Sequence, residues 1–286
     1  MKGYLFVVFV LLCSFSRLSA QEVIPYQIFT ASGKPVAFKK LAKAAEEADI
    51  VLFGEYHNNA IAHWLQYELT SLLIQSDKPL VLGAEMFEAD NQSALNAYIT
   101  GEIDAKTFAE QARLWNNFNT DYKPLADLAK TFKRPFVATN VPRKYASQVF
   151  RAGLESLDTL SAMEKSWIAP LPIAYDASLP GYQAMLEMGG GHGGDNLPKA
   201  QAIKDATMAH FILSHFTEGQ RFIHYNGAYH SDNYEGILWY LKRQSPNLKY
   251  LTISTVSQDD VSRLLPENKG RADFIICVDS NMTNTY

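Results

Sequence analysis

The sequence places the pattern Gly-x-x-His twice, each time directly after an apolar run that is typical of a β-strand. The first copy holds Gly54 and His57 in VLFGEYH, and the second holds Gly227 and His230 in YNGAYH. Glycine lets a chain turn sharply off a strand, so that the side chain after the turn can face a cleft. The repetition predicts that both imidazoles face one shared site.

Acidic and other polar side chains follow the same kind of apolar run. Glu55 lies two residues before His57, and Glu85 follows the run PLVLGA. Histidine combined with carboxylate is the usual mixture for a metal site or for acid–base catalysis. We therefore take Glu55, His57, Glu85 and His230 as candidate catalytic residues of a hydrolase, or as ligands of a divalent metal. Three more side chains in similar positions are expected to be polar groups of the same cleft: Asn140, Arg143 and Tyr229.

These residues also have a purely structural interpretation. A single histidine at a strand end is more often a capping or hydrogen-bonded residue than a ligand. Glu85 can equally be an acid near a helix N-terminus, where the helix dipole favours negative charge. Four such groups at the ends of successive strands favour a functional site over four separate explanations.

A glycine-rich stretch supplies a different set of candidate ligands. In YQAMLEMGGGHGGDN, a tyrosine and two methionines precede the run 189–194, and a histidine lies within it. Repeated glycine gives the backbone too much freedom for a helix, so a loop is expected here. Tyrosine, histidine and methionine all occur as axial ligands of haem iron. The alternative is a surface loop whose histidine has no role. The candidates for haem binding are Tyr182, Met185, Met188 and His192.

Six short apolar runs, rich in β-branched residues, predict the strands that must position these groups. They are centred near Ile50, Val81, Val137, Ile223, Ile253 and Ile275. Helix-length segments separate them, and 60–74 is expected to be the first crossover helix. This alternation is typical of an α/β fold with a parallel sheet, and the nearly continuous apolar runs indicate strands covered on both faces. Ligands of such sheets bind beyond the carboxyl ends of the strands, where the candidate residues fall.

Two longer tracts do not fit a simple alternation of strand and helix. Residues 89–133 and 141–216 have mainly helical patterns. We interpret them as helical insertions into a single domain of residues 21–286, lying over one edge of the sheet. The remaining histidines fall within helix or strand patterns and are assigned to structure: His63, His210, His215 and His224.

The N-terminal segment, residues 1–20, is expected to be a secretory signal peptide. Lys2 precedes a short apolar run, and Ser19 and Ala20 provide small residues for cleavage. The alternative is a lipoprotein signal with a lipid anchor at Cys13, although Leu12 is a poor residue at that cleavage position. The run is shorter than the ~20 residues that span a bilayer. The protein is therefore expected in the periplasm or attached to the envelope.

Composition excludes some classes of partner and of covalent structure. The net charge is −4, hydrophobic residues make up 47% of the chain, and no basic run is present. Nucleic acid is therefore not an expected partner. Only Cys277 remains after cleavage at Ala20. An intramolecular disulfide is then impossible, and the core must hold the fold together.

The sequence resembles the ChaN-like haem-binding lipoproteins, which belong with the Tiki, TraB and erythromycin esterase group. The matching segments run from about Val51 to His230: VLFGEYH, GAEMFEADNQSALNAYITGEID, FVATNVPRKYASQVFRAGLESL, AQAIKDATMAHFI and YNGAYH. The paired Gly-x-x-His motifs and the acid after the second strand are shared by the group, whereas TNVPR and AQAIKDATMAH are specific to the ChaN branch. The weak lipoprotein signal at Cys13 departs from the family pattern.

The resemblance implies a parallel α/β domain with an added helical part. It implies haem binding at the cell envelope for iron acquisition, an outer-membrane haem transport system as partner, and a homodimer that encloses haem. The shared motifs do not carry over the iron ligand itself. In the wider group, residues such as Glu55, His57, Glu85 and His230 are linked to metal-assisted hydrolysis. A metal-dependent hydrolase of a peptide or ester is therefore the alternative to a haem-binding protein.

Overall fold

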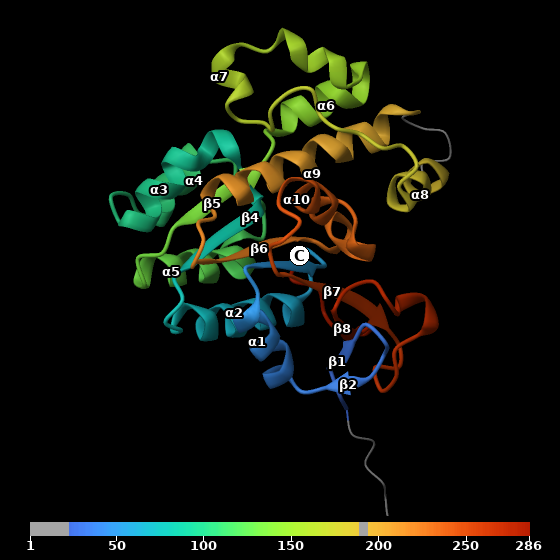
Figure 1. Cartoon of the computed structure of the whole chain (residues 1–286). Coiled ribbons are helices and arrows are strands. Elements are labelled where there is room, and N and C mark those ends of the chain that lie inside the picture. The colour runs from blue at the N-terminus through green and yellow to red at the C-terminus, as the bar shows by residue number, and fades with distance from the viewer. Residues whose placement is uncertain (1–22, 189–193) are drawn as a thin grey trace, which may run out of the picture.

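A computed structural model describes residues 23–188 and 194–286, and its centre is an eight-stranded sheet (Figure 1). The strand order is β2-β1-β8-β7-β3-β6-β4-β5. The strands are β1 (Tyr26–Thr30), β2 (Pro35–Val36), β3 (Ile50–Glu55), β4 (Leu80–Glu88), β5 (Phe136–Asn140), β6 (Arg221–Gly227), β7 (Tyr250–Gln258) and β8 (Phe274–Asp279). The helices are α1 (Phe38–Glu47), α2 (Ala60–Ile74), α3 (Gln92–Thr100), α4 (Ala105–Gln111), α5 (Lys123–Thr131), α6 (Arg143–Ala152), α7 (Ala162–Lys165), α8 (Pro180–Met188), α9 (Asn196–His215) and α10 (Ile237–Gln244).

The α/β class and the six strands expected from the sequence are confirmed. Strands β3 to β8 coincide with the six apolar runs, and all of them pair in parallel with their neighbours among these six. The two remaining strands were not expected: β1 pairs antiparallel with β8, and β2 pairs antiparallel with β1. Every residue of β3 is buried, because β3 lies between β6 and β7 and is covered on both faces.

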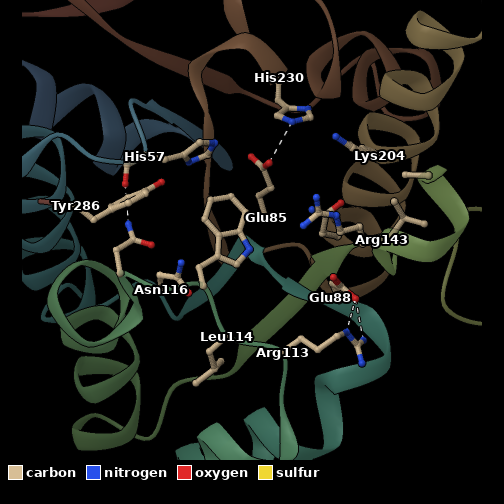
Figure 2. Close-up of a pocket in the computed structure, with 15 residues that line it drawn as sticks. His57, Glu85, Glu88, Arg113, Leu114, Asn116, Arg143, Lys204, His230 and Tyr286 are labelled. Atoms are coloured by element: carbon tan, nitrogen blue, oxygen red, sulfur yellow. Dashed lines mark hydrogen bonds and ion pairs between the residues drawn. The ribbon is translucent and has the colours of Figure 1, made fainter. Parts of the chain in front are cut away.

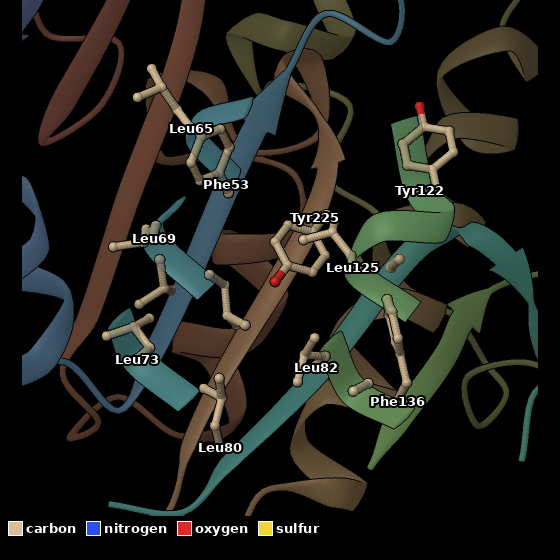
Figure 3. Close-up of a cluster of buried hydrophobic side chains, with 14 of the residues drawn as sticks. Phe53, Leu65, Leu69, Leu73, Leu80, Leu82, Tyr122, Leu125, Phe136 and Tyr225 are labelled. Carbon is tan, nitrogen blue, oxygen red and sulfur yellow. The ribbon is translucent and has the colours of Figure 1, made fainter. Parts of the chain in front are cut away.

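Helix α2 coincides with the expected crossover helix and shows why this segment is helical. The side chain of Asn59 caps it by accepting a hydrogen bond from the backbone N–H of Ala62 at 2.9 Å. Leu65, Leu69 and Leu73 repeat at four-residue spacing and face the sheet beside Phe53, Leu80 and Tyr225 (Figure 3).

The two helical tracts do not lie over one edge of the sheet, contrary to the expectation from sequence. Residues from α3, α4 and α5 join the core on the face that α1 and α2 cover, whereas residues from α6, α9 and α10 form the core on the opposite face (Figure 1). Each tract therefore contains one crossover helix: α5 leads into β5, and α9 leads into β6. Apolar residues spread along a tract cannot reveal which face of a sheet it covers.

Leu69 and Leu72 lie in the same helix but in opposite environments, which makes them a matched pair. Leu69 is fully buried, and Leu72 is 46% exposed. We expect Leu69→Ala to lower the free energy of unfolding by about 2–5 kcal/mol, because the substitution leaves a cavity in the core. Leu72→Ala should change it by only about 0.5 kcal/mol. Urea unfolding of both variants measures the difference, and equal losses would contradict the assigned faces of α2.

Candidate functional site

The carboxyl ends of four neighbouring strands meet at one rim of the sheet. Glu55 at the end of β3 lies opposite Gly227 at the end of β6, and Glu88 of β4 lies opposite Asn140 of β5. Two cavities of about 700 and 590 Å³ open above this rim. They share His57, His230 and Tyr286, and we call them together the groove (Figure 2).

Glu85 lies inside a strand, not after it as the sequence suggested. Strand β4 continues to Glu88, and its register with β5 shifts between Ala84 and Glu88. Such an irregularity bends a strand and re-aims the side chains within it. The carboxylate of Glu85 lines the groove, and its Oε2 accepts a hydrogen bond from the backbone N–H of Gly227 at 2.7 Å.

The two motif glycines provide space and do not provide a turn. Neither has a positive φ angle, and both lie within strands. A Cβ atom on Gly227 would lie 2.7 Å from Nε2 of His57, and one on Gly54 would lie 2.9 Å from the Cα atom of Ala228. The expected role in turning the chain is therefore wrong. Glycine is required at 227 because the imidazole of His57 approaches the backbone closely, and at 54 because neighbouring backbone atoms do.

His57 is held by a buried carboxylate. Nδ1 of His57 lies 2.9 Å from Oε1 of Glu55, which is itself 1% exposed. The hydroxyl of Tyr122 donates to the same oxygen at 2.8 Å, and the side-chain amide of Gln66 donates to the other. Three partners satisfy the buried carboxylate and fix the imidazole, whose ring meets Trp115 edge-on at 4.7 Å between centroids. The Nε2 side of His57 is thereby presented to the groove.

His230 lies between two buried carboxylates. Its Nδ1 is 2.5 Å from Oδ1 of Asp205, and its Nε2 is 3.2 Å from Oε1 of Glu85. The side-chain nitrogen of Gln201 lies 2.9 Å from Nδ1 of His230. Asp205 and Gln201 belong to α9, so this helix and strand β4 hold the imidazole from opposite sides. A buried charge of this kind is tolerated only when it is paired.

The pKa values of these groups follow from burial and from their mutual charges. Burial disfavours the charged form of His230, but Glu85 and Asp205 outweigh it and raise the pKa of His230 to about 9. Burial alone would raise the pKa of Glu85, yet the charge and the hydrogen bond of His230 hold it well below its usual range. Burial raises the pKa of Asp205. Burial also opposes the charging of His57, but its hydrogen bond to Glu55 leaves the pKa raised.

One wall of the groove carries positive charge. Arg113, Arg143 and Lys204 all line the larger cavity. Arg113 is neutralised by ion pairs with Glu88 and Asp90. Arg143 and Lys204 form no ion pair with any residue that the structure describes. Two cations therefore face the groove without an anionic partner among the described residues.

The last described residues of the chain cross the groove. Thr285 donates from its backbone N–H to the carbonyl of Asn58 at 2.9 Å and from its hydroxyl to Asp121 at 2.6 Å. These bonds place Tyr286 beside His57 in both cavities (Figure 2). The C-terminal segment thus forms part of the groove wall.

The residues expected in the groove from sequence are placed as follows. Asn140 and Arg143 line the larger cavity, and Tyr229 lines the smaller one. Met185 also lines the smaller cavity. Tyr182 is buried away from both, and its hydroxyl lies 3.3 Å from Oδ2 of Asp205. His192 and the side chain of Met188 lie outside what the structure describes, as do the signal peptide and Cys13.

The four side chains considered as metal ligands form hydrogen-bonded pairs and not a metal cage. Glu55 pairs with His57, and Glu85 pairs with His230. In residues 23–188 and 194–286, no group of three or more His, Cys, Asp or Glu side chains is placed to hold a metal ion. The structure therefore gives no support to the expected divalent metal.

Several site residues were missed by sequence reasoning. Asp205, Gln201 and Lys204 all lie in the segment AQAIKDATMAH, whose helical pattern does not show which of its polar residues face the sheet rim. Tyr122 and Trp115 lie in the tract 89–133, whose helical pattern does not distinguish site residues from core residues. Tyr286 carried no signal, because nothing in the sequence shows where a chain terminus packs.

The buried pair of His230 and Glu85 predicts how stability depends on pH. Because the pKa of His230 is about 9 in the folded chain and 6.5 in its reference state, its stabilising contribution is complete below pH 6.5 and is lost as pH rises through 9. We expect the free energy of unfolding to fall between pH 7 and 9.5, with a weaker fall in Glu85→Gln. Urea unfolding across this range measures both slopes. Identical slopes in the two proteins would contradict the pairing of His230 with Glu85. His224 does not contribute to the slope, because burial lowers its pKa to about 4, below this pH range.

Three proteins of known structure share this fold. ChaN of Campylobacter jejuni, whose structure is described as showing cofacial haem binding, has a TM-score of 0.66 and 16% identity over 88% of this chain and 96% of that chain. The erythromycin esterase EreC in its open conformation has a TM-score of 0.51 and 10% identity over 91% of this chain and 100% of that chain. The type III effector HopBA1 has a TM-score of 0.51 and 13% identity over 85% of this chain and 94% of that chain. At these identities the three likenesses show the fold alone.

A search of curated proteins gave no match. The family model described as haem-binding uptake, Tiki superfamily, ChaN, matches residues 41–241, which is more than half of the chain. This span contains both Gly-x-x-His motifs, Glu85 and Asp205. The chain therefore belongs to the ChaN family of haem-binding uptake proteins.

Proposed function

We propose that this protein binds haem in the groove and serves haem or iron acquisition. The observation that carries the proposal is the family match, together with a groove whose walls suit an anionic, flat ligand. Its two cavities of about 700 and 590 Å³ fall within the ~300–1,000 Å³ of typical small-molecule sites. Trp115, Val141 and Leu114 contribute apolar surface beside the polar floor.

The charges of the groove match those of haem. Haem carries two propionates, and the groove offers two cations, Arg143 and Lys204, that no described carboxylate neutralises. Guanidinium and ammonium groups form charge-assisted hydrogen bonds with carboxylates. These two side chains would bind and orient the propionates, while the iron supplies a coordination position for a protein ligand.

We propose that the iron ligand comes from α8 or the stretch that follows it. Met185 already lines the groove. Tyr182 is the preferred donor for ferric iron, because phenolate is a hard anionic ligand. In the ligand-free molecule burial and the charge of Asp205 raise the pKa of Tyr182, so its binding to iron requires that it leave Asp205 and lose its proton.

A second candidate function, hydrolysis of an ester or peptide, is favoured by one observation. The imidazole of His57 is oriented by buried Glu55 and presents Nε2 to the groove, which is the arrangement of a general base. His57 would take a proton from a water molecule as that water attacks a carbonyl carbon. Haem binding is preferred, because the family match concerns haem and the groove carries two cations that no described carboxylate neutralises.

We further propose that the protein acts outside the cytoplasm, as a homodimer, and exchanges haem with an outer-membrane transport system. The support is the apolar segment before Ala20 and the family's association with uptake. Within the described residues no helix is long and apolar enough to cross a membrane.

Haemin titration of the purified protein tests the function and the ligand together. We expect a saturable Soret band that Tyr182→Phe or His192→Ala shifts, because each removes a donor from the proposed ligand segment. His57→Ala and His230→Ala should keep the band, since these imidazoles are engaged by Glu55 and by Asp205 with Glu85.

The same titration can contradict the proposal in two distinct ways. Unsaturable absorbance with folded wild-type protein would reject haem binding, and hydrolysis of a chromogenic ester that depends on His57 would then favour the second function. A haem band that is lost in His57→Ala or His230→Ala, but unchanged in Tyr182→Phe and His192→Ala, would leave haem binding intact and move the ligand to the strand ends. Circular dichroism of each variant establishes that it is folded.

The intact mass of protein recovered from the cell envelope tests export. We expect a mature chain that begins at Gln21, because small residues at Ser19 and Ala20 suit signal peptidase. A lipid-modified chain that begins at Cys13 would contradict cleavage after Ala20 and show that the exported protein carries a lipid anchor. An unprocessed chain confined to the cytoplasm would contradict export altogether.

A further inference from the structure

A separate cavity lies at the opposite end of β5 from the groove. It has a volume of about 640 Å³ and is formed by α3, the end of α5 and the start of β5. The groove reaches β5 at Asn140, whereas this cavity reaches it at Phe136, so about 13 Å of strand separates them at ~3.3 Å per residue. No residue lines both, and we call this second space the α3–α5 cavity.

Three cations surround the α3–α5 cavity: Lys130, Lys133 and Arg134. None of them forms an ion pair within the described parts of the chain. Lys130 lies over the ring of Tyr98, with Nζ 4.6 Å from the centroid. The exposed carboxyl of Asp104 has a lowered pKa chiefly through its hydrogen bonds to Thr107, and the charge of Lys130 contributes least. The cluster therefore keeps most of its positive charge.

Arg134 is the least satisfied of the three. A guanidinium carries five N–H donors. That of Arg134 makes one long hydrogen bond, from Nη2 to the carbonyl of Ile74 at 3.5 Å, and its Nε is buried without a partner among the described residues. A buried donor without a partner is costly, and an anion beside the guanidinium would supply the missing acceptors.

The rest of the cavity wall is apolar. Ile99, Pro135 and Phe136 form it, and Phe136 belongs to the main core. An inorganic anion would satisfy the three cations but leave this apolar surface uncovered. An apolar molecule without charge would cover the surface but leave the cations without a partner. The combination selects a ligand that has both parts.

We propose that the α3–α5 cavity binds an amphipathic organic anion, with one carboxylate or phosphate head against Arg134 and its two neighbouring lysines and an apolar chain along Ile99 and Phe136. The proposal commits to a free amphiphile, because the volume of about 640 Å³ is that of a small-molecule site. It does not depend on haem binding in the groove.

Calorimetric titration of the whole protein with dodecanoate, below its micelle concentration, tests the proposal. We expect saturable binding of one dodecanoate per chain. Arg134→Gln should weaken it about tenfold, because a charge-assisted hydrogen bond is lost. Lys133→Gln, at an exposed position, should weaken dodecanoate binding several-fold. This variant replaces Arg134→Gln as the test if Arg134→Gln fails to fold. Arg151→Gln, on α6 and away from the cavity, is the matched control and should leave the affinity unchanged.

Three further ligands make the outcome decisive. Dodecyltrimethylammonium, with the opposite charge, and inorganic phosphate, without the chain, should each bind at least tenfold more weakly than dodecanoate. If either ligand binds as tightly as dodecanoate, the proposal is wrong. It is also wrong if Arg134→Gln and Lys133→Gln leave the dodecanoate affinity unchanged. Loss of dodecanoate binding in Arg143→Gln would place the ligand in the groove instead. Binding to phosphatidylglycerol vesicles without binding of dodecanoate would also overturn it, in favour of a membrane surface.

Discussion

The burial of His230 between Glu85 and Asp205 is the interaction on which the rest of the site depends. Three ionisable groups lie buried together, and the two carboxylates stabilise the charged form of His230 against the cost of its burial. Their arrangement depends on a strand irregularity that aims Glu85 inward and on helix α9, which brings Asp205 from the opposite side. The glycine at 227 leaves room for the imidazole of His57 beside Glu85. A parallel sheet provides this setting because the carboxyl ends of its strands gather at one rim.

The groove therefore has a floor of hydrogen-bonded side chains at the strand ends and walls that come from other segments. The floor consists of strand ends and their hydrogen-bonded pairs, Glu55 with His57 and Glu85 with His230. The walls come from α8, the N-terminal end of α6 and the C-terminal segment that carries Tyr286. The same fold also occurs in an erythromycin esterase, so the fold alone does not determine which ligand the groove takes.

The sequence predicted the strands and the rim well, because both depend on local pattern. Apolar runs of β-branched residues located β3 to β8, and the rule for parallel sheets brought Glu55, His57, Glu85 and His230 together. It failed where the answer depends on contacts between distant segments. The role of Gly227 depends on His57, which is far away in sequence, and the side of the sheet that α5 and α9 cover depends on the connections around β5. Asp205 and Lys204 belong to the segment AQAIKDATMAH, but only the structure shows that Asp205 contacts His230 and that Lys204 lines the groove.

The position of bound iron tests the account most directly. Crystals grown with haemin would give an anomalous signal at the iron absorption edge, independent of any assumed ligand. The account predicts one strong peak within the groove, above the ends of β3, β4 and β6, with the haem edge toward Arg143 and Lys204. An iron peak outside the groove, for example in the α3–α5 cavity, would contradict haem binding in the groove. Fully occupied haem held only by contacts outside the groove would contradict it as well.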